Sequence, residues 1–93
     1  MVGLGRWVAV PLPGVELTPT PDGLVVFDPS TQQVHHLNES AMAVYTLADG
    51  SLDDAEIASE IADIWELDAP PYDAVAEAMK GLVASGLLLR RRV

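Results

Sequence analysis

The sequence has 93 residues, of which 49% are hydrophobic and 20% are charged, and it contains no cysteine. This length predicts a single domain, since about 100 to 150 residues per domain is usual, and it leaves little room for an enclosed substrate cavity. The absence of thiols excludes disulfides, thiolate metal sites and a cysteine nucleophile. A reducing cytoplasm is the expected location.

The charge is strongly negative, at -9, because 14 acidic residues face only 5 basic ones. The basic residues are Arg6, Lys80, Arg90, Arg91 and Arg92. A surface with so few cations repels phosphate groups, so nucleic acid and anionic membrane surfaces are not the expected partners. No stretch approaches the roughly 20 apolar residues of a membrane span.

After an N-terminal arm expected to be flexible (1–13), the chain reads as three strands separated by turns. The strands are predicted over Val15–Pro19, Leu24–Phe27 and Gln32–Leu37, with turn residues at 21–23 and 28–31. Consecutive hairpins of this kind form an antiparallel meander. Pro19 and Pro21 blunt its first edge, whereas the third strand carries no proline and its edge is open.

From Asn38 the apolar period changes from 2 to about 3.6, which predicts helices. Asn38 is a good N-cap for the first helix, and Asp49-Gly50 ends it. Asp53 and Glu56 have the spacing of a capping box ahead of the second helix. The second helix has an apolar face that is predicted to form core, made of Ile57, Ala58, Ile61, Ala62, Ile64 and Trp65.

The third predicted helix begins near Pro71 and ends near Gly86. Its apolar side is made of Val75, Ala78, Met79, Leu82 and Val83. Leu87–Leu89 either continues as a short strand or packs under the helices, ahead of a basic tail (90–93). The predicted fold is therefore α+β, with a three-stranded antiparallel sheet followed by a three-helix bundle over residues 14–89.

Two adjacent histidines, His35 and His36, are the first candidates for a chemical site. Neighbouring side chains of a strand point to opposite faces, so the two rings diverge and cannot chelate one ion. No serine lies in a nucleophile elbow, and the glycines form no phosphate-binding loop. We therefore expect no catalytic residues, no metal site, no cofactor and no enzyme activity.

The tryptophans differ in context. Trp65 is expected in the core. Trp7, in the arm, is either a clamp over the sheet or an exposed contact residue.

The open edge of the third strand suggests a different kind of site. A helix beside such an edge forms a groove, in which an extended peptide pairs with the strand while its side chains dock on the helix. The architecture is thus typical of a peptide binder.

Two segments resemble the PqqD-like peptide chaperones, the recognition elements for precursors of ribosomally synthesised, post-translationally modified peptides. They are "GLVVFDPSTQQVHHLNESAMAVYTLADGSLDDAEIASEIADIW" and "AVAEAMKGLVASGLL". The resemblance covers about residues 14–89, and its matching elements are Asp28, Leu37-Asn38, Ala41, Asp49-Gly50 and the final Leu82–Leu88.

The resemblance implies a winged-helix-like fold that binds the leader of a precursor peptide as an added strand and delivers it to an enzyme. The implied strand edge is Gln32, Gln33, Val34, His35, His36 and Leu37, and the implied helix wall is Val75, Met79, Leu82 and Val83. The phrase "DGLVVFDPSTQQ" favours lasso-peptide biosynthesis, with a leader peptidase as the partner. The alternative is a chaperone for a radical SAM enzyme in pyrroloquinoline quinone biosynthesis.

The sequence departs from the family in its third strand, where most members have aromatic residues and this chain has Val34, His35 and His36. Two other classes of function remain as alternatives. A winged-helix nucleic-acid binder would need a basic recognition helix, and the third helix offers Lys80 alone. A homodimer would use the open edge of the third strand on itself.

Overall fold

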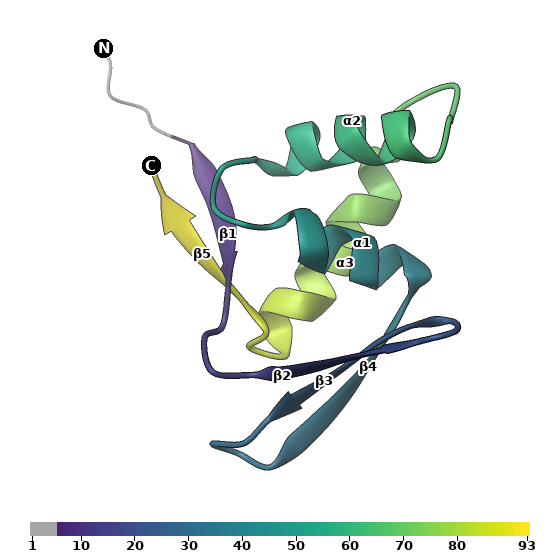
Figure 1. The fold of residues 1–93 in the computed structure, drawn as a ribbon. Helices are drawn as coiled ribbons and strands as arrows, with labels where there is room; N and C mark the ends of the chain where they lie inside the picture. The colour runs from purple at the N-terminus through teal and green to yellow at the C-terminus, as the bar shows by residue number, and fades with distance from the viewer. Residues whose placement is uncertain (1–5) are drawn as a thin grey trace.

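The computed structural model describes residues 6–93 (Figure 1). The elements in chain order are β1 (Trp7–Pro11), β2 (Glu16–Thr20), β3 (Gly23–Asp28), β4 (Gln33–Asn38), α1 (Glu39–Leu47), α2 (Asp54–Ile64), α3 (Tyr72–Ala84) and β5 (Leu88–Arg92). The strands β2, β3 and β4 form the predicted antiparallel sheet, and β1 pairs separately with β5. The α+β prediction is confirmed, and the predicted third strand is β4.

The register of the meander directs one face of the sheet toward the helices. Leu24 of β3 lies opposite Leu37 of β4, and Val26 lies opposite His35. Residues paired in this way share a face. Leu24 and Val26 are buried, while the alternate residues of β3, Val25 and Phe27, are only half-buried. The helices therefore cover the face of the sheet that carries Leu24 and Val26.

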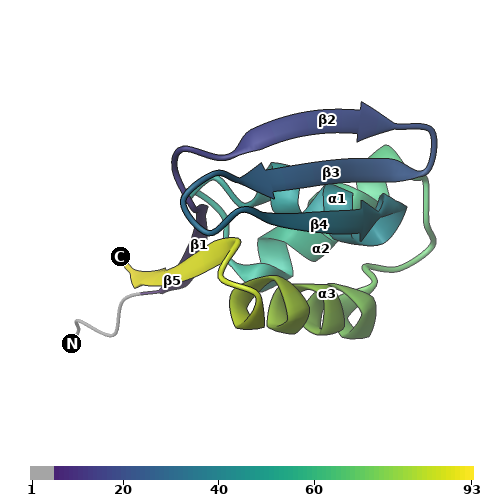
Figure 2. The ribbon, with the colours of Figure 1, turned by 90° about the horizontal axis from the view of Figure 1, so that it is seen from below.

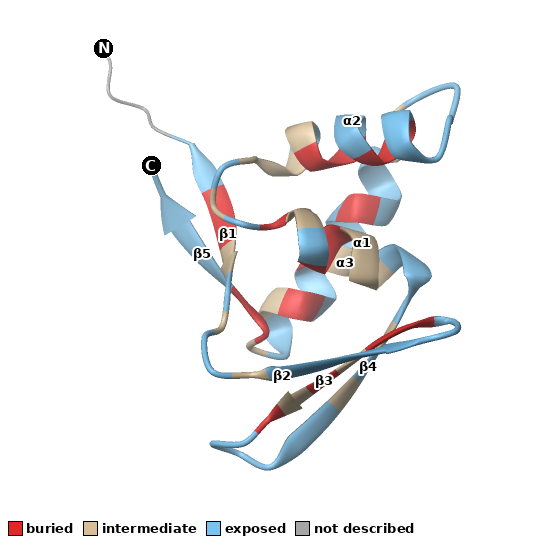
Figure 3. Ribbon diagram, in the orientation of Figure 1, coloured by how far each residue is buried: buried red, intermediate tan, exposed pale blue. Residues whose placement is uncertain are grey.

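One core joins this sheet to all three helices. Figure 3 marks buried positions on each of these helices in red. Burying a large aliphatic side chain contributes about 1.5 to 3 kcal/mol, so this core supplies most of the driving force for folding. Its helical members include Val44, Tyr45, Ile57, Ala58, Ile61, Val75, Met79 and Leu82.

The predicted helix starts are confirmed by their hydrogen bonds. The side chain of Asn38 accepts a bond of 2.8 Å from the backbone N–H of Ala41. Asp53 and Glu56 form the reciprocal capping box, with donor to acceptor distances of 2.8 and 2.9 Å. These bonds satisfy N–H groups that a helix leaves without an internal partner.

The prediction that Trp65 is a core residue is wrong. Trp65 is 39% exposed, and its neighbour Ile64 is 60% exposed. The helix α2 ends at Ile64, and Glu66 has a positive φ of 54° that turns the chain away. The apolar period in the sequence therefore continues beyond the last turn that packs on the core.

The two ends of the described chain form a ribbon, in contrast to the loose arm and free tail that the sequence suggested. The strand β1 pairs antiparallel with β5, from Trp7 opposite Arg92 to Pro11 opposite Leu88. The backbones of Arg6 and Val93 exchange two hydrogen bonds of 2.8 Å. The expected arm also includes residues 1–5, which lie outside the described part. Both alternatives left for Leu87–Leu89 hold in part, since Leu88 and Leu89 belong to β5 while Leu87 and Leu88 are buried in the core.

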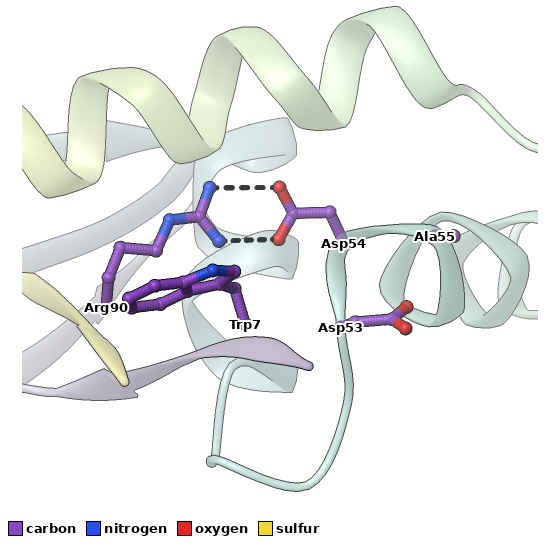
Figure 4. Close-up of a pocket in the computed structure, with 5 residues that line it drawn as sticks. All are labelled: Trp7, Asp53, Asp54, Ala55 and Arg90. Carbon is purple, nitrogen blue, oxygen red and sulfur yellow. Dashed lines mark hydrogen bonds and ion pairs between the residues drawn. The ribbon is translucent and has the colours of Figure 1, made fainter. Parts of the chain in front are cut away.

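Arginines anchor the ribbon to the first turn of α2. Arg90 donates to both carboxylate oxygens of Asp54, at 2.8 and 3.0 Å, and Arg6 donates to Glu56 at 2.7 Å. The indole of Trp7 lies beside the Arg90 guanidinium (Figure 4) and is 57% exposed. Trp7 is thus an exposed residue of the ribbon and does not cover the three-stranded sheet. None of the helices in residues 6–93 combines the length and apolarity needed to cross a membrane.

Candidate functional site

The strand β4 lies at an edge of its sheet. Within residues 6–93 it pairs with β3 alone, because the strand order is β2-β3-β4. Figure 2 shows α3 running along the side of β4 that faces away from β3. An edge strand of this kind offers unpaired backbone groups to an additional strand.

The positions of these unpaired groups follow from a proline in β2. Pro19, which lies opposite Leu24, has no N–H to donate, so this pair is not hydrogen-bonded and Leu24 directs its backbone groups toward β4. Its partner there, Leu37, points back toward β3. Because the direction alternates along an antiparallel strand, Val34 and His36 direct their N–H and C=O groups to the open edge.

A groove of about 450 Å³ lies between β4 and α3. The strand contributes Val34, His35, His36 and Leu37, and the other lining residues are Ala41, Glu77, Ala78, Gly81, Leu82, Ser85 and Leu87. Of the four lining residues from α3, Ala78 and Gly81 are small. At Gly81 an added Cβ would meet no atom within 4 Å, so the groove is open above this residue.

The two histidines lie on opposite faces of β4, as strand geometry predicts. His35 is half-buried on the helix side, together with Leu37, whereas His36 and Val34 are exposed. Both rings nevertheless border the groove, because the groove follows the strand edge. Across the described residues, no three His, Asp or Glu side chains are placed to hold a metal ion.

The structure divides the predicted strand residues into two groups. Val34 to Leu37 line the groove. Gln33 is the first residue of β4, and Gln32 precedes it in the turn with a positive φ of 60°. Both glutamines are exposed at the start of the strand and are not among the lining residues.

Of the predicted helix residues, Leu82 alone lines the groove. Val75 and Met79 are 2% and 0% exposed and belong to the core. Val83 is half-buried against the core and is absent from the groove. A helix has about 3.6 residues per turn, so Val83 projects from the flank of the core-facing side that is opposite the groove.

Besides Glu77, the wall residues that sequence reasoning missed are three small ones, Ala78, which was assigned only to the apolar side, Gly81 and Ser85. They are spaced three and four positions apart, so they form one stripe along α3 beside the core-facing residues. This spacing of small residues is visible in the sequence. The sequence does not show that this flank, and not the other, faces the edge of β4.

Charge in the groove is carried by a single carboxylate. Glu77 is the one acidic residue among those that line it, and no Lys or Arg is among them. A basic side chain on the bound molecule would therefore find a complementary group here.

A second carboxylate shapes the turn that leads into β4. Asp28 accepts hydrogen bonds from the Ser30 hydroxyl at 2.7 Å and from the Ser30 backbone N–H at 3.0 Å. The hydroxyl bond is the main reason that the pKa of Asp28 lies below its ordinary value of 3.8. This carboxylate therefore holds the β3 to β4 hairpin in its ionised form.

Comparison with protein-family models gives a match over most of the chain. The family model described as coenzyme PQQ synthesis protein D (PqqD) matches residues 23–88. No curated protein and no solved structure matches the chain. The matched segment begins with β3, ends with the first residue of β5 and includes every residue that lines the groove.

Proteins of this family are non-catalytic peptide-binding chaperones, and they act on a precursor peptide together with a partner enzyme. The match covers well over half of the 93 residues. The chain therefore belongs to the PqqD family.

Proposed function

We propose that this protein binds the leader region of a ribosomally synthesised precursor peptide as an additional strand on β4 and delivers it to a processing enzyme. The observation that carries the proposal is the open edge of β4 directly beside the groove against α3. An extended peptide there gains backbone hydrogen bonds from the strand, while its alternate side chains enter the groove.

The shape of the groove indicates which side chains the peptide presents. Ala78 and Gly81 leave space on the helix wall, so this part of the groove suits large apolar side chains. Glu77 favours a lysine or arginine nearby. On the strand side the peptide contacts mainly the backbone of Val34 and His36. The histidine side chains therefore contribute less to recognition than the backbone does.

The proposed site differs from the expected one on the helix side. We propose that Val75 and Met79 support the wall from the core and do not touch the peptide, because both are buried. The contact residues of α3 are then Ala78, Gly81 and Leu82.

We favour a lasso-peptide pathway in the cytoplasm, with a separate leader peptidase as the enzyme served. The stretch "DGLVVFDPSTQQ" supports this choice through its resemblance to standalone lasso elements. The alternative is delivery to a radical SAM enzyme of pyrroloquinoline quinone biosynthesis, for which the description of the matching family model is the support. The precursor peptide that binds distinguishes the two.

The proposal is tested by titrating isotope-labelled protein with the leader of the precursor encoded beside its gene and following the amide NMR shifts. We expect the largest shifts at 33–38 and 77–85. If none of these amides moves at millimolar peptide, the strand-addition proposal fails.

A proline substitution isolates the backbone contact. Val34→Pro removes an N–H that points to the open edge and leaves the pairing with β3 intact, so leader affinity should fall about tenfold, the equivalent of roughly 1.4 kcal/mol. Leu17→Pro is the matched control, because Leu17 is exposed and its N–H points outward at the opposite edge, in β2. Equal affinities of the two variants, measured by calorimetry, would contradict the proposed site.

A further inference from the structure

A second apolar surface lies where α2 ends and α3 begins, outside the groove. We define the α2–α3 corner by its residues Ile64, Trp65, Leu67, Pro71 and Tyr72. Four of these are exposed large hydrophobics, at 60%, 39%, 42% and 54% for Ile64, Trp65, Leu67 and Tyr72. Grouped exposure of this kind marks interaction surfaces in small domains.

The corner contains a small hollow with a volume of about 50 Å³. Its lining residues are Ser40, Val44, Ile61, Trp65, Leu67, Pro71, Ala74 and Val75. All except Ser40 are apolar, and the volume exceeds the roughly 30 Å³ that one water occupies in the liquid. The hollow therefore suits the tip of an apolar side chain from a partner.

Acidic residues are concentrated in the part of the sequence that forms the corner. Between residues 60 and 77 the chain contains no Lys or Arg, whereas it contains Glu60, Asp63, Glu66, Asp68, Asp73 and Glu77. All six are exposed. A second copy of this chain would bring the same charges against them, so the surface complements a partner whose apolar contact is ringed by cations.

The corner also adjoins one end of the groove. Ser40 lines the hollow, and the next residue, Ala41, lines the groove, so the first turn of α1 separates the two. Along α3, Ala74 lines the hollow and Ala78, four residues later, lines the groove, so the two are neighbours on one face of the helix. A protein seated on the corner would therefore lie beside a peptide that leaves the groove past Leu37.

We propose that the α2–α3 corner is the docking surface for the processing enzyme, which contacts it through apolar side chains surrounded by Lys and Arg. This inference rests on the proposed function, since it places the enzyme next to one end of the bound leader. Two separate surfaces would allow the protein to hold peptide and enzyme at the same time.

The test measures two affinities by calorimetry, one for the leader peptide and one for the processing enzyme encoded beside the gene. The double variant Asp63→Lys with Asp68→Lys reverses charge at the corner. We expect its enzyme affinity to fall about tenfold or more and its leader affinity to stay within twofold. Glu16→Lys with Thr18→Lys is the control, because both residues are exposed on β2, at the edge of the sheet away from β4, and it should leave both affinities unchanged.

A fluorine label gives a second measurement that does not require a substitution at the corner. In protein containing 5-fluorotryptophan, the Trp65 resonance should shift when enzyme is added, while the Trp7 resonance on the ribbon stays in place. A Trp7→Phe variant assigns the two signals.

The outcomes separate this inference from the proposed function. If the leader binds but the corner variant and its control bind the enzyme equally, the docking surface is refuted and the peptide site stands. If the wild-type protein fails to bind the leader, the proposed function fails and this inference fails with it. If the corner variant keeps its circular dichroism but loses both affinities, the corner is not a separate surface and the inference is overturned.

Discussion

Gly81 and Met79 are two positions apart on α3 and lie on different sides of it. Met79 is fully buried in the core, whereas Gly81 is exposed and borders the groove. Glycine inside a helix is less favourable than alanine by about 1 kcal/mol. At Gly81 this cost to the helix falls beside open space that a peptide side chain could fill. Gly81 therefore lowers the stability of the helix at the place where we propose that the peptide binds.

Gly81→Leu should reduce leader affinity by filling the groove while leaving the fold intact. We expect the free energy of unfolding to stay the same or rise by about 0.5 to 1 kcal/mol, because leucine favours helix. Calorimetric titration and urea unfolding measure the two effects. Ala76→Leu, at an exposed position of α3 outside the groove, is the control and should keep wild-type affinity.

Met79→Ala should show the opposite pattern. Removing a fully buried methionine leaves a cavity and should lower the free energy of unfolding by about 2 to 5 kcal/mol. Leader affinity of the folded protein should change little, because Met79 does not line the groove. If the variant is folded by circular dichroism but has lost affinity for the leader, Met79 is a contact residue after all.

Asp28 should make the hairpin sensitive to acid. Its folded pKa lies below 3.8, so the ionised carboxylate stabilises the fold above that pH, and the contribution is lost as pH falls through the lowered pKa. Wild type should be more stable than Asp28→Asn at pH 6, and the difference should shrink below about pH 4. A difference in urea midpoints that stays constant down to pH 2 would refute this role.

At the scale of elements, buried apolar residues and ion pairs both hold β1 and β5 in place, and they contribute unequally to the stability of the ribbon. Leu88 and Val8 are fully buried, whereas the Arg90 and Asp54 side chains are 35% and 39% exposed. Exposed ion pairs typically contribute about 0 to 1 kcal/mol. The ribbon is therefore held mainly by its apolar residues.

Two substitutions test this division. Leu88→Ala should lower the free energy of unfolding by about 2 to 5 kcal/mol. Arg90→Ala should lower it by less than about 1 kcal/mol, even though it removes two hydrogen bonds to Asp54. Thermal or urea unfolding measures the free energy of unfolding of both variants. A larger loss of stability for Arg90→Ala than for Leu88→Ala would show that the ion pair is the principal anchor.

Turns and helix caps could be predicted from the sequence, whereas the ribbon of β1 and β5 could not. The turn at Pro21-Asp22 and the caps at Asn38 and Asp53 depend on neighbouring residues, so a short stretch of sequence shows them. The pairing of Trp7 with Arg92 joins opposite ends of the chain, and three consecutive arginines resemble a solvated tail more than a strand. For the proposed site, the β4 edge can be identified from local sequence, whereas the flank of α3 that faces it depends on packing.

At the scale of the whole molecule, charge is distributed unevenly. Four of the five basic residues lie at the two ends of the chain, and the fifth is Lys80 on α3. With a net charge of -9, two copies that joined through their β4 edges would repel each other. The same charge disfavours nucleic acid, because α3 would meet phosphates with one lysine.

The protein should therefore sediment as a monomer at low ionic strength, near 10 mM, where screening is weakest. The comparison is a concentration series of wild type and Val34→Pro in the analytical ultracentrifuge. A dimer that forms in wild type and disappears in Val34→Pro would show that the open edge pairs with itself. Leader binding would then have to displace a second copy.

The hydrogen bonds between Arg6 and Val93 have a consequence for protein engineering. Since their backbones are in direct contact, the described chain begins and ends at one place, at the far tip of the ribbon (Figure 2). A domain of this shape can be spliced into a surface loop of a host protein without stretching either connection. A leader-reading unit could thus be built into an unrelated enzyme through one insertion point, with the β4 edge left uncovered.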